Sequence, residues 1–346
     1  MRVFTTIPQA DLKDVPAAVA AIEAGGYDGV TTMENRHDPF LPLAIAAVHS
    51  KRLELSTGIT IAFGRSPMVV ANQGWDLQRA SGGRFVVGLG SQVKGHIERR
   101  FSGTWRAPAQ RMREYVESLK AIWRCWETDG PLDYQGEHYQ FSLMTPHFRP
   151  EPLATRPPAV TIAAVGPAMM RVAGTSCDGV RLHPFCTRKY LEDTVLPRLE
   201  TALDESGRKR ASFEIVGGGF LATGPDDATV DKLLQWVRQR VGFYGSTRAY
   251  WPVLEAHGLE DLGLKLNRMA RENQWEAMTA EVPEDVARLF AAVGRHEEIA
   301  TAIEERFGGV SDSLNTSSSS EIPGDLPPDL VQDIQRIATP FQGYAL

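Results

Sequence analysis

Glycines at positions 88, 90 and 95 follow a short apolar run in the stretch RFVVGLGSQVKG (84–95). Because glycine has no side chain, such a backbone can approach a flat ring or a phosphate closely. A dinucleotide fingerprint would need its glycines on the first strand-to-helix turn, a helix directly after them, and an acidic residue about 20 positions later. Here the glycines end the fourth predicted strand, and the next long helix is expected only from Arg106 onward. The spacing argues against a dinucleotide-binding domain and leaves either another ligand or a tight loop without one.

His37 lies in the segment MENRHDPF (33–40), directly after the second predicted strand, with Glu34 and Asp38 beside it. A histidine at this place could move a proton or polarise a substrate, because its pKa is ordinarily near neutral. Glu34 or Asp38 could orient its ring, and both could equally cap a helix or lie at the surface. His183, at the end of the sixth predicted strand, is the weaker candidate. A purely structural histidine is the alternative for both.

The segment AVGPAMM (164–170) follows the fifth predicted strand and opens a helix. Pro167 suits the first helical turn, where a backbone N–H is not needed. The amides of Gly166, Ala168 and Met169 would have no partner within the helix, so they could bind an anion at its positive end. A capped helix without a ligand is the alternative.

The composition narrows the class of protein and of partner. Of the 346 residues, 42 % are apolar, which is enough for a large core. Lys and Arg total 37 against 43 Asp and Glu, with no basic block, so nucleic acid is not an expected partner. No window approaches the roughly 18 apolar residues of a membrane span, and the start of the chain has no signal-peptide pattern, so we expect a cytoplasmic protein. Cys125, Cys177 and Cys186 lie in no ligand spacing, which predicts buried thiols without a disulfide or a metal site.

Predicted strands and helices alternate along most of the chain. Strands are expected at 2–7, 27–33, 53–63, 84–90, 159–165, 178–183 and 213–223, with helices between them, among them 67–80, 106–127 and 188–206. The strands are apolar on both faces, which is typical of a parallel sheet buried on both sides. We therefore predict an α/β fold with one (β/α)8 TIM barrel over 1–346.

The eighth strand is the least clear element of this barrel. We place it at GGVSDSLN (308–315), although RVGFYG (240–245) competes for the role. Helix-rich sequence at about 247–292 would then be an insertion. A small hairpin is expected at 132–141, and the polar run at about 316–326 is expected to be a flexible segment.

Several of these stretches together resemble a known family. RASGGRFVVGLGSQ (79–92), the His37 segment and STGITIAFGRSP (56–67) resemble the signature of the bacterial luciferase-like flavin and deazaflavin oxidoreductases, and the resemblance extends to about residue 315. Within that superfamily, HDPFLPLA (37–44), AAVGPAMMRVAG (163–174) and FYGSTRAYWPVLEAHG (243–258) look most like the branch that uses the deazaflavin coenzyme F420.

The resemblance implies roles for individual residues. Family members carry a bulge with a non-prolyl cis peptide against one face of the ring system, which corresponds to Gly58–Ile59 here. They place the cofactor phosphate where this chain has the 164–170 segment, and an active-site histidine where it has His37. The cofactor-binding positions implied are Gly58, Ile59, Thr60, Gly90, Ser91, Gln92, Gly166, Pro167, Ala168 and Met169, and the catalytic positions implied are His37 and Glu34.

Two departures from the family pattern bear on the substrate. Sugar-phosphate dehydrogenases of the superfamily carry a glutamate proton donor where this chain has Val93, and an aromatic residue where it has Leu41. A sugar 6-phosphate is therefore not the expected substrate, and the proton donor is unassigned, with Lys94 and His96 nearby.

The resemblance implies a homodimeric oxidoreductase that transfers a hydride between C5 of coenzyme F420 and a small organic substrate. His37 would polarise the substrate or move the proton. An FMN-dependent monooxygenase is the alternative within the enzyme class, and a flavin-binding protein without turnover is the alternative outside it. A barrel lyase or aldolase without a flavin is a further alternative, but neither a barrel lysine nor an acidic metal set favours it.

Overall fold

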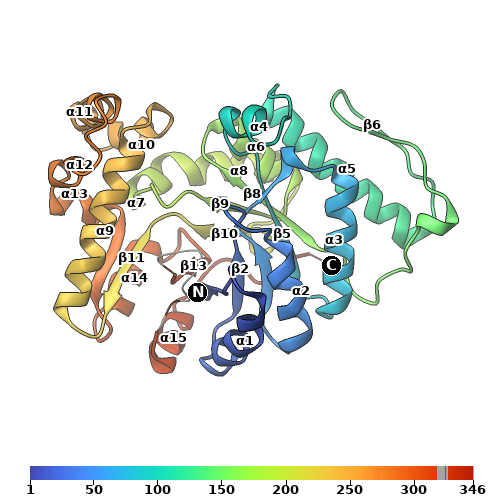
Figure 1. Ribbon diagram of the computed structural model, residues 1–346, viewed down its shortest axis with the longest axis horizontal. Coiled ribbons are helices and arrows are strands. Elements are labelled where there is room, and N and C mark those ends of the chain that lie inside the picture. Colours follow the sequence, from blue (N-terminus) through green and yellow to red (C-terminus); the bar gives the residue numbers. More distant parts are fainter. Residues whose placement is uncertain (318–323, 325, 346) are drawn as a thin grey trace.

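A closed barrel of parallel strands forms the centre of the molecule (Figure 1). The computed structural model describes residues 1–317, 324 and 326–345. Strand β3 pairs with both β2 and β5, which closes the ring. In chain order the barrel strands are β1 (Arg2–Thr6), β2 (Gly29–Thr32), β3 (Glu54–Thr57), β4 (Thr60–Ile61), β5 (Phe85–Gly90), β8 (Ala159–Ala164), β9 (Gly179–Leu182), β10 (Glu214–Gly217) and β13 (Ser313–Asn315). The predicted α/β TIM barrel is confirmed.

The last strand of the barrel is β13, in the segment predicted as the eighth strand. Its Ser313 lies opposite Arg2 of β1 on one side and opposite Val216 of β10 on the other. The competing segment 240–245 ends helix α9 (Asp227–Gly245). Val237 and Val241 of this helix are one turn apart and fully buried. Their helical spacing explains why the segment is helical and not a strand.

The third predicted strand is interrupted. It forms β3 and β4 with a cis peptide bond between Gly58 and Ile59, and a turn of 3₁₀ helix, η2 (Ala62–Gly64), follows. The cis peptide is the feature that the family resemblance predicts at this place, and the prediction is confirmed.

The prediction of a single strand at 213–223 is wrong. Gly217 and Gly218 have φ values of 77° and 98°, which only glycine adopts readily, and they turn the chain out of the barrel after β10. The second half becomes β11 (Phe220–Gly224), which pairs in parallel with β12 (Ala291–Arg295) as a separate two-stranded sheet. The strand β12 is not predicted from the sequence.

Helices surround the barrel. Those that follow the strands are α1 (Val15–Ala24), α2 (Phe40–His49), α3 (Pro67–Ala80), α4 (Lys94–Arg99), α5 (Pro108–Thr128), α6 (Pro167–Ser176), α7 (Arg188–Tyr190), α8 (Leu196–Glu205), α9 and α14 (Ile299–Phe307), and α15 (Pro328–Gln335) lies near the C-terminus. Short α4 is not predicted. The helix predicted at 188–206 contains a π-helical turn, η4 (Leu191–Val195), between α7 and α8.

Two additions flank the barrel on opposite sides (Figure 1). On one side α9 packs with α11 (Glu260–Arg271), α12 (Met278–Glu281) and α13 (Glu284–Leu289), and α10 (Trp251–Glu255) packs against α11. On the other side lies the predicted hairpin, β6 (Tyr134–Gln135) with β7 (Gln140–Phe141). Most of the segment predicted to be flexible, 318–323 and 325, lies outside the described residues.

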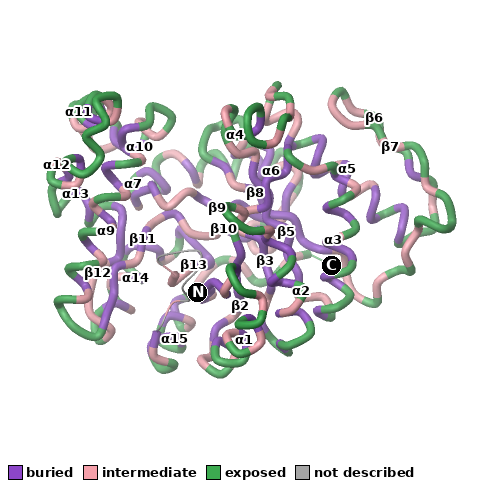
Figure 2. Tube along the Cα trace, viewed as in Figure 1, coloured by how far each residue is buried: buried purple, intermediate pink, exposed green. Residues whose placement is uncertain are grey.

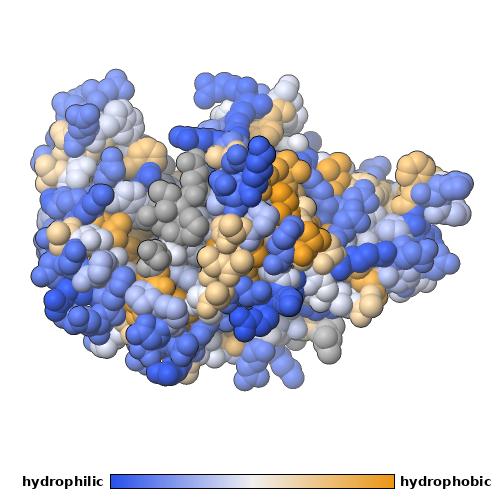
Figure 3. Space-filling view, turned by 60° about the horizontal axis from the view of Figure 1, so that its bottom comes forward, coloured by the Kyte–Doolittle hydropathy of each residue, from blue (hydrophilic) through white to orange (hydrophobic). Residues whose placement is uncertain are grey.

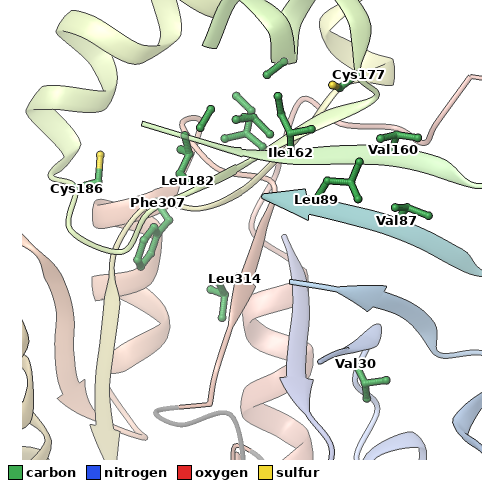
Figure 4. Close-up of a cluster of buried hydrophobic side chains, with 14 of the residues drawn as sticks. Val30, Val87, Leu89, Val160, Ile162, Cys177, Leu182, Cys186, Phe307 and Leu314 are labelled. Atoms are coloured by element: carbon green, nitrogen blue, oxygen red, sulfur yellow. The ribbon is translucent and has the colours of Figure 1, made fainter. Parts of the chain in front are cut away.

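The barrel strands are buried, whereas the helices expose one face (Figure 2). Val87 and Leu89 of β5 join the apolar core with Val160 and Ile162 of β8 (Figure 4). Hydrophilic side chains cover much of the face in Figure 3, with apolar patches between them. No helix in the described part of the chain is long and apolar enough to cross a membrane.

Candidate active site

A cavity of about 680 Å³ lies where the carboxyl ends of the barrel strands meet α9 and β11. This end of a TIM barrel is where active sites form, because the strand-to-helix loops converge there. Among the apolar residues in its wall are Leu182, Phe307 and Leu314, which Figure 4 shows. The polar residues that matter most below are Arg181 and His183 from the β9 segment and Arg240 from α9.

The Gly58–Ile59 bulge forms part of the cavity wall. The amide of Gly58 donates to the carbonyl of Thr32 (2.6 Å), and the carbonyl of Ile59 accepts from the amide of Glu34 (3.1 Å). The end of β2 and the loop after it therefore hold the bulge in place.

Two of the glycines in the 84–95 stretch make room for this bulge. A Cβ atom on Gly88 would lie 1.8 Å from the carbonyl oxygen of Thr57, and one on Gly90 would lie 2.6 Å from Cδ1 of Ile59. Gly90 is buried and does not line the cavity. Close packing between neighbouring strands accounts for these glycines without a direct ligand contact.

Arg181 lies inside the barrel beside the bulge. Its Nε donates to Oγ1 of Thr161 (2.8 Å), and its guanidinium would be 3.2 Å from a Cβ on Gly58. Deeper in the barrel, Arg2 forms ion pairs with Glu54 and Glu214, both at 2.9 Å. Burial raises the pKa of Glu54. The pKa of Glu214 is lowered, because Arg2 and, with a smaller effect, Arg181 outweigh its burial.

His183 lines the cavity within an aromatic cluster. Its ring contacts Tyr244 edge to face, with centroids 4.5 Å apart, and lies 4.6 Å from the ring of Tyr250. Burial lowers the pKa of His183 to about 4. Its Nδ1 accepts the amide proton of Phe185 (3.0 Å), so the neutral ring carries its proton on Nε2. Since Nε2 has no partner among the described residues, it can donate a hydrogen bond to a ligand.

The predicted anion site lies at the N-terminus of α6, next to Val165 in the cavity wall. Gly166, Pro167 and Ala168 are exposed, and a Cβ on Gly166 would meet nothing within 4 Å. The amides of Ala168 and Met169 have no backbone acceptor in the described part of the chain, and no side chain caps the helix. This helix end is open, as an anion site requires.

The other histidine candidate, His37, is exposed and is not among the residues that line the cavity. The carboxylate of Glu34 binds residues other than His37. The Glu34 carboxylate accepts from the amide of Ile61 (2.7 Å) and from the guanidinium of Arg65 (2.6 Å), which also pairs with Asp38 (2.8 Å). Glu34 therefore fastens the loop after β2 to the end of β4.

The remaining predicted cofactor positions lie outside the cavity wall. Thr60 is fully buried in β4. Ser91 and Gln92 are half-buried beyond the end of β5, and Ser91 Oγ donates to the carbonyl of Gln92 (3.1 Å). Of all the predicted site residues, Gly58 and Ile59 line the cavity directly, together with the weaker candidate His183.

Comparisons with known proteins agree with this architecture. Residues 2–312 match the family described as luciferase-like monooxygenase. The chain belongs to the luciferase-like monooxygenase family. The family resemblance predicted from the sequence is therefore confirmed.

Individual relatives of this luciferase-like chain differ in how much is known of them. An uncharacterised protein of Mycobacterium tuberculosis is 46 % identical over 309 residues, which cover 89 % of this chain and 91 % of that protein. A 5,10-methylenetetrahydromethanopterin reductase of Archaeoglobus fulgidus is 26 % identical over 86 % of this chain and 87 % of its own. The coenzyme F420 dependent tetrahydromethanopterin reductase of Methanopyrus kandleri has the same fold, with a TM-score of 0.75 at 19 % identity, over 97 % of this chain and 98 % of its own.

Sequence reasoning missed part of the candidate site. Arg181 could have been noticed as a charged residue within a buried strand, and the three glycines at 217–219 as a turn at the end of the seventh strand. Trp236, Arg240 and Tyr244 gave no such signal, because only the packing of α9 against the barrel brings them to the cavity.

Proposed function

We propose that this protein is an F420-dependent oxidoreductase acting on a small organic substrate. The observation that carries the proposal is that the cavity has the Gly58–Ile59 bulge in its wall and the open end of α6 beside it. The reductase relatives support deazaflavin, since one is described as coenzyme F420 dependent.

The described residues fit such a cofactor. Free amides at Ala168 and Met169, with open space at Gly166, would hold its phosphate, and the bulge would lie against its ring. When bound, the deazaflavin supplies hydride transfer at its C5 carbon. The protein's part is to orient the substrate, to exclude water and to place a hydrogen-bond donor at the reacting oxygen.

We assign that hydrogen bond to Nε2 of His183, because this residue lines the cavity and its Nε2 has no partner in the described part of the chain. A neutral imidazole that donates in this way polarises a carbonyl without giving up its proton. His37, which the family resemblance nominates, stays a prediction, and Glu34 is proposed as a positioning residue through Arg65 rather than as a catalytic one. Ser91 and Gln92 stay predicted cofactor contacts.

Side-by-side titration of the purified protein with coenzyme F420 and with FMN tests the proposal, followed by tryptophan fluorescence and visible absorbance. We expect F420 to bind at least tenfold more tightly than FMN. Tighter binding of FMN, together with substrate-dependent oxygen uptake, would instead support a monooxygenase. Binding of F420 without turnover of any substrate in a broad screen would support a cofactor-binding protein, and binding of neither cofactor would refute the proposal.

A homodimer in the cytoplasm is part of the same proposal, on the resemblance alone. Light scattering after size-exclusion chromatography should give about twice the mass of the 38.1 kDa chain. A mass equal to one chain would refute the dimer.

A further inference from the structure

The charge lining the cavity is opposite to that of the protein. The chain has a formal net charge of −6. Among the described residues that line the cavity, however, there are two arginines, Arg181 and Arg240, and neither aspartate nor glutamate. A concave site with one sign of charge and low-dielectric walls concentrates ligands of the opposite sign. The cavity is therefore suited to an anionic ligand.

The guanidinium of Arg240 has no polar partner in the described part of the chain. It makes no hydrogen bond or ion pair with any residue in the described ranges, and its one contact of note is the ring of Trp236, 5.3 Å from its guanidinium carbon. Arg238 on the same helix differs, since it donates to the carbonyl of Val282 (2.8 Å) and to Gln235 (3.1 Å). Arg238 fastens α9 to its neighbours, whereas Arg240 has its donors available to a ligand.

Arg240 lies between two aromatic residues of α9, each about one helical turn away. Trp236, Arg240 and Tyr244 are four residues apart, so they form one stripe along the helix, and all three line the cavity. Tyr244 contacts His183, which we take as the hydrogen-bond donor to the reacting group. One helical turn, about 6 Å along the axis, therefore separates the free cation from the aromatic residue beside His183.

The second cation, Arg181, is placed for a different task. It is bound to Thr161 inside the barrel and lies against the Gly58 bulge, where the cofactor ring is expected. Arg240 comes instead from α9, outside the ring of barrel strands. The two arginines thus belong to different parts of the cavity, and Arg240 lies on the part left to the substrate.

We propose that the substrate is a small organic acid whose carboxylate, phosphate or sulfonate binds Arg240 while its apolar part lies along Trp236 and Tyr244. This inference rests on the proposed function only in naming the ligand a substrate. The acid group would set the substrate's position, so that its reacting group lies about one helical turn away, next to His183.

Binding of matched probes to the F420-loaded protein tests the inference. We choose naphthalene-2-carboxylate and its neutral carboxamide, which differ in charge and little in shape, and we measure their affinities calorimetrically. The acid should bind at least tenfold more tightly than the amide. Arg240→Gln should remove that difference, whereas Lys232→Gln, an exposed residue on the same helix that does not line the cavity, should keep it. Unchanged circular dichroism and thermal midpoints would show that both variants are folded.

Several outcomes would overturn the inference. Equal affinities of acid and amide would do so, as would full retention of acid binding in Arg240→Gln. Loss of F420 affinity in Arg240→Gln, or displacement of F420 by the acid, would show that Arg240 holds the cofactor instead. Binding of the acid through Arg240 in a protein that binds no F420 would keep the anion site and refute the proposed function, so the two failures are distinguishable.

Discussion

The carbonyl oxygen of Thr57 fills the space in which a side chain at Gly88 would begin, since a Cβ there would lie 1.8 Å away. Thr57 also donates its hydroxyl to the carbonyl of Gly88 (2.8 Å) and accepts the Gly88 amide (2.9 Å). Neighbouring strands are thus locked together directly before the Gly58–Ile59 bulge. The glycine at 88 serves the packing of the barrel.

Gly88→Ala should therefore destabilise the protein by about 3 kcal/mol or more, because the backbone carbonyl of Thr57 cannot move aside as a flexible side chain could. The measurement is chemical unfolding followed by circular dichroism. Gly166→Ala is the matched control, since nothing lies within 4 Å of a Cβ there and φ is −87°, so its effect should stay within about 0.5 kcal/mol. Equal stability of the two variants would contradict this account of Gly88.

Gly166→Asp tests the phosphate site at the start of α6. The exposed position can accept the side chain, so the fold should be unaffected, whereas a carboxylate beside the free amides repels a phosphate. We expect the affinity for F420 to fall at least tenfold in the titration, with Gly166→Ala close to the unmodified protein. Undiminished affinity in Gly166→Asp would place the phosphate elsewhere.

The barrel could be predicted from the sequence because each element carries its own periodicity. Strands such as 84–90 are apolar on both faces, and α3 has Ser66 and Pro67 at its start, so the local signals agree with the global fold. The prediction of the seventh strand failed because, apart from Glu214 and Thr223, the segment 213–223 is apolar on both sides of its glycines. The positive φ angles at Gly217 and Gly218 divide it, and the three consecutive glycines at 217–219 were the available signal of that turn.

The site could be predicted only in part. Gly58 and Ile59, which line the cavity, could be named in advance because their motif is contiguous in the sequence, and the cis peptide between them is confirmed. The role of the α6 segment stays a prediction. Arg240 lies about 60 residues beyond His183 in the chain and reaches the same cavity only through the packing of α9. Proximity of this kind depends on tertiary structure, which a single sequence without a motif does not reveal.

The Glu34–Arg65 pair gives a prediction about stability. The side chains are 7 % and 16 % exposed, so neutralising the carboxylate leaves a largely buried guanidinium with Asp38 as its remaining acidic partner. Glu34→Gln should lower the free energy of unfolding by about 2–3 kcal/mol, near the lower end for a broken buried pair because Gln still accepts a hydrogen bond.

Glu298→Gln is the control for that change. Glu298 forms an exposed pair with Arg295, and such pairs contribute about 0–1 kcal/mol. Chemical unfolding of both variants provides the comparison. If Glu34→Gln kept its stability but lost turnover, Glu34 would act in catalysis and not in positioning.

The pH dependence of stability tests the burial of His183. Because burial lowers the pKa of His183 to about 4, the folded protein keeps it neutral at pH values where the unfolded chain, with an ordinary pKa near 6.5, binds a proton. Stability from this source is complete above about pH 6.5 and is lost as the pH falls toward 4, which amounts to about 2 kcal/mol between pH 8 and pH 5. His183→Gln should remove that part of the pH dependence in unfolding experiments, whereas His37→Gln, at an exposed position, should not.

Alanine variants of the same two histidines distinguish their roles in turnover. With a substrate in hand, His183→Ala should lower kcat about 100-fold or more, the usual effect of losing a group that acts on the reacting oxygen, with F420 affinity little changed. A plot of the rate of the unmodified enzyme against pH should show no change in slope near pH 6.5 that comes from His183. The reason is that Nε2 stays protonated, and the ring neutral, until the pH approaches 4. A large loss of kcat in His37→Ala with no loss in His183→Ala would show that His37 is the catalytic histidine. It would also mean that the loop after β2 moves to the cavity when ligands bind.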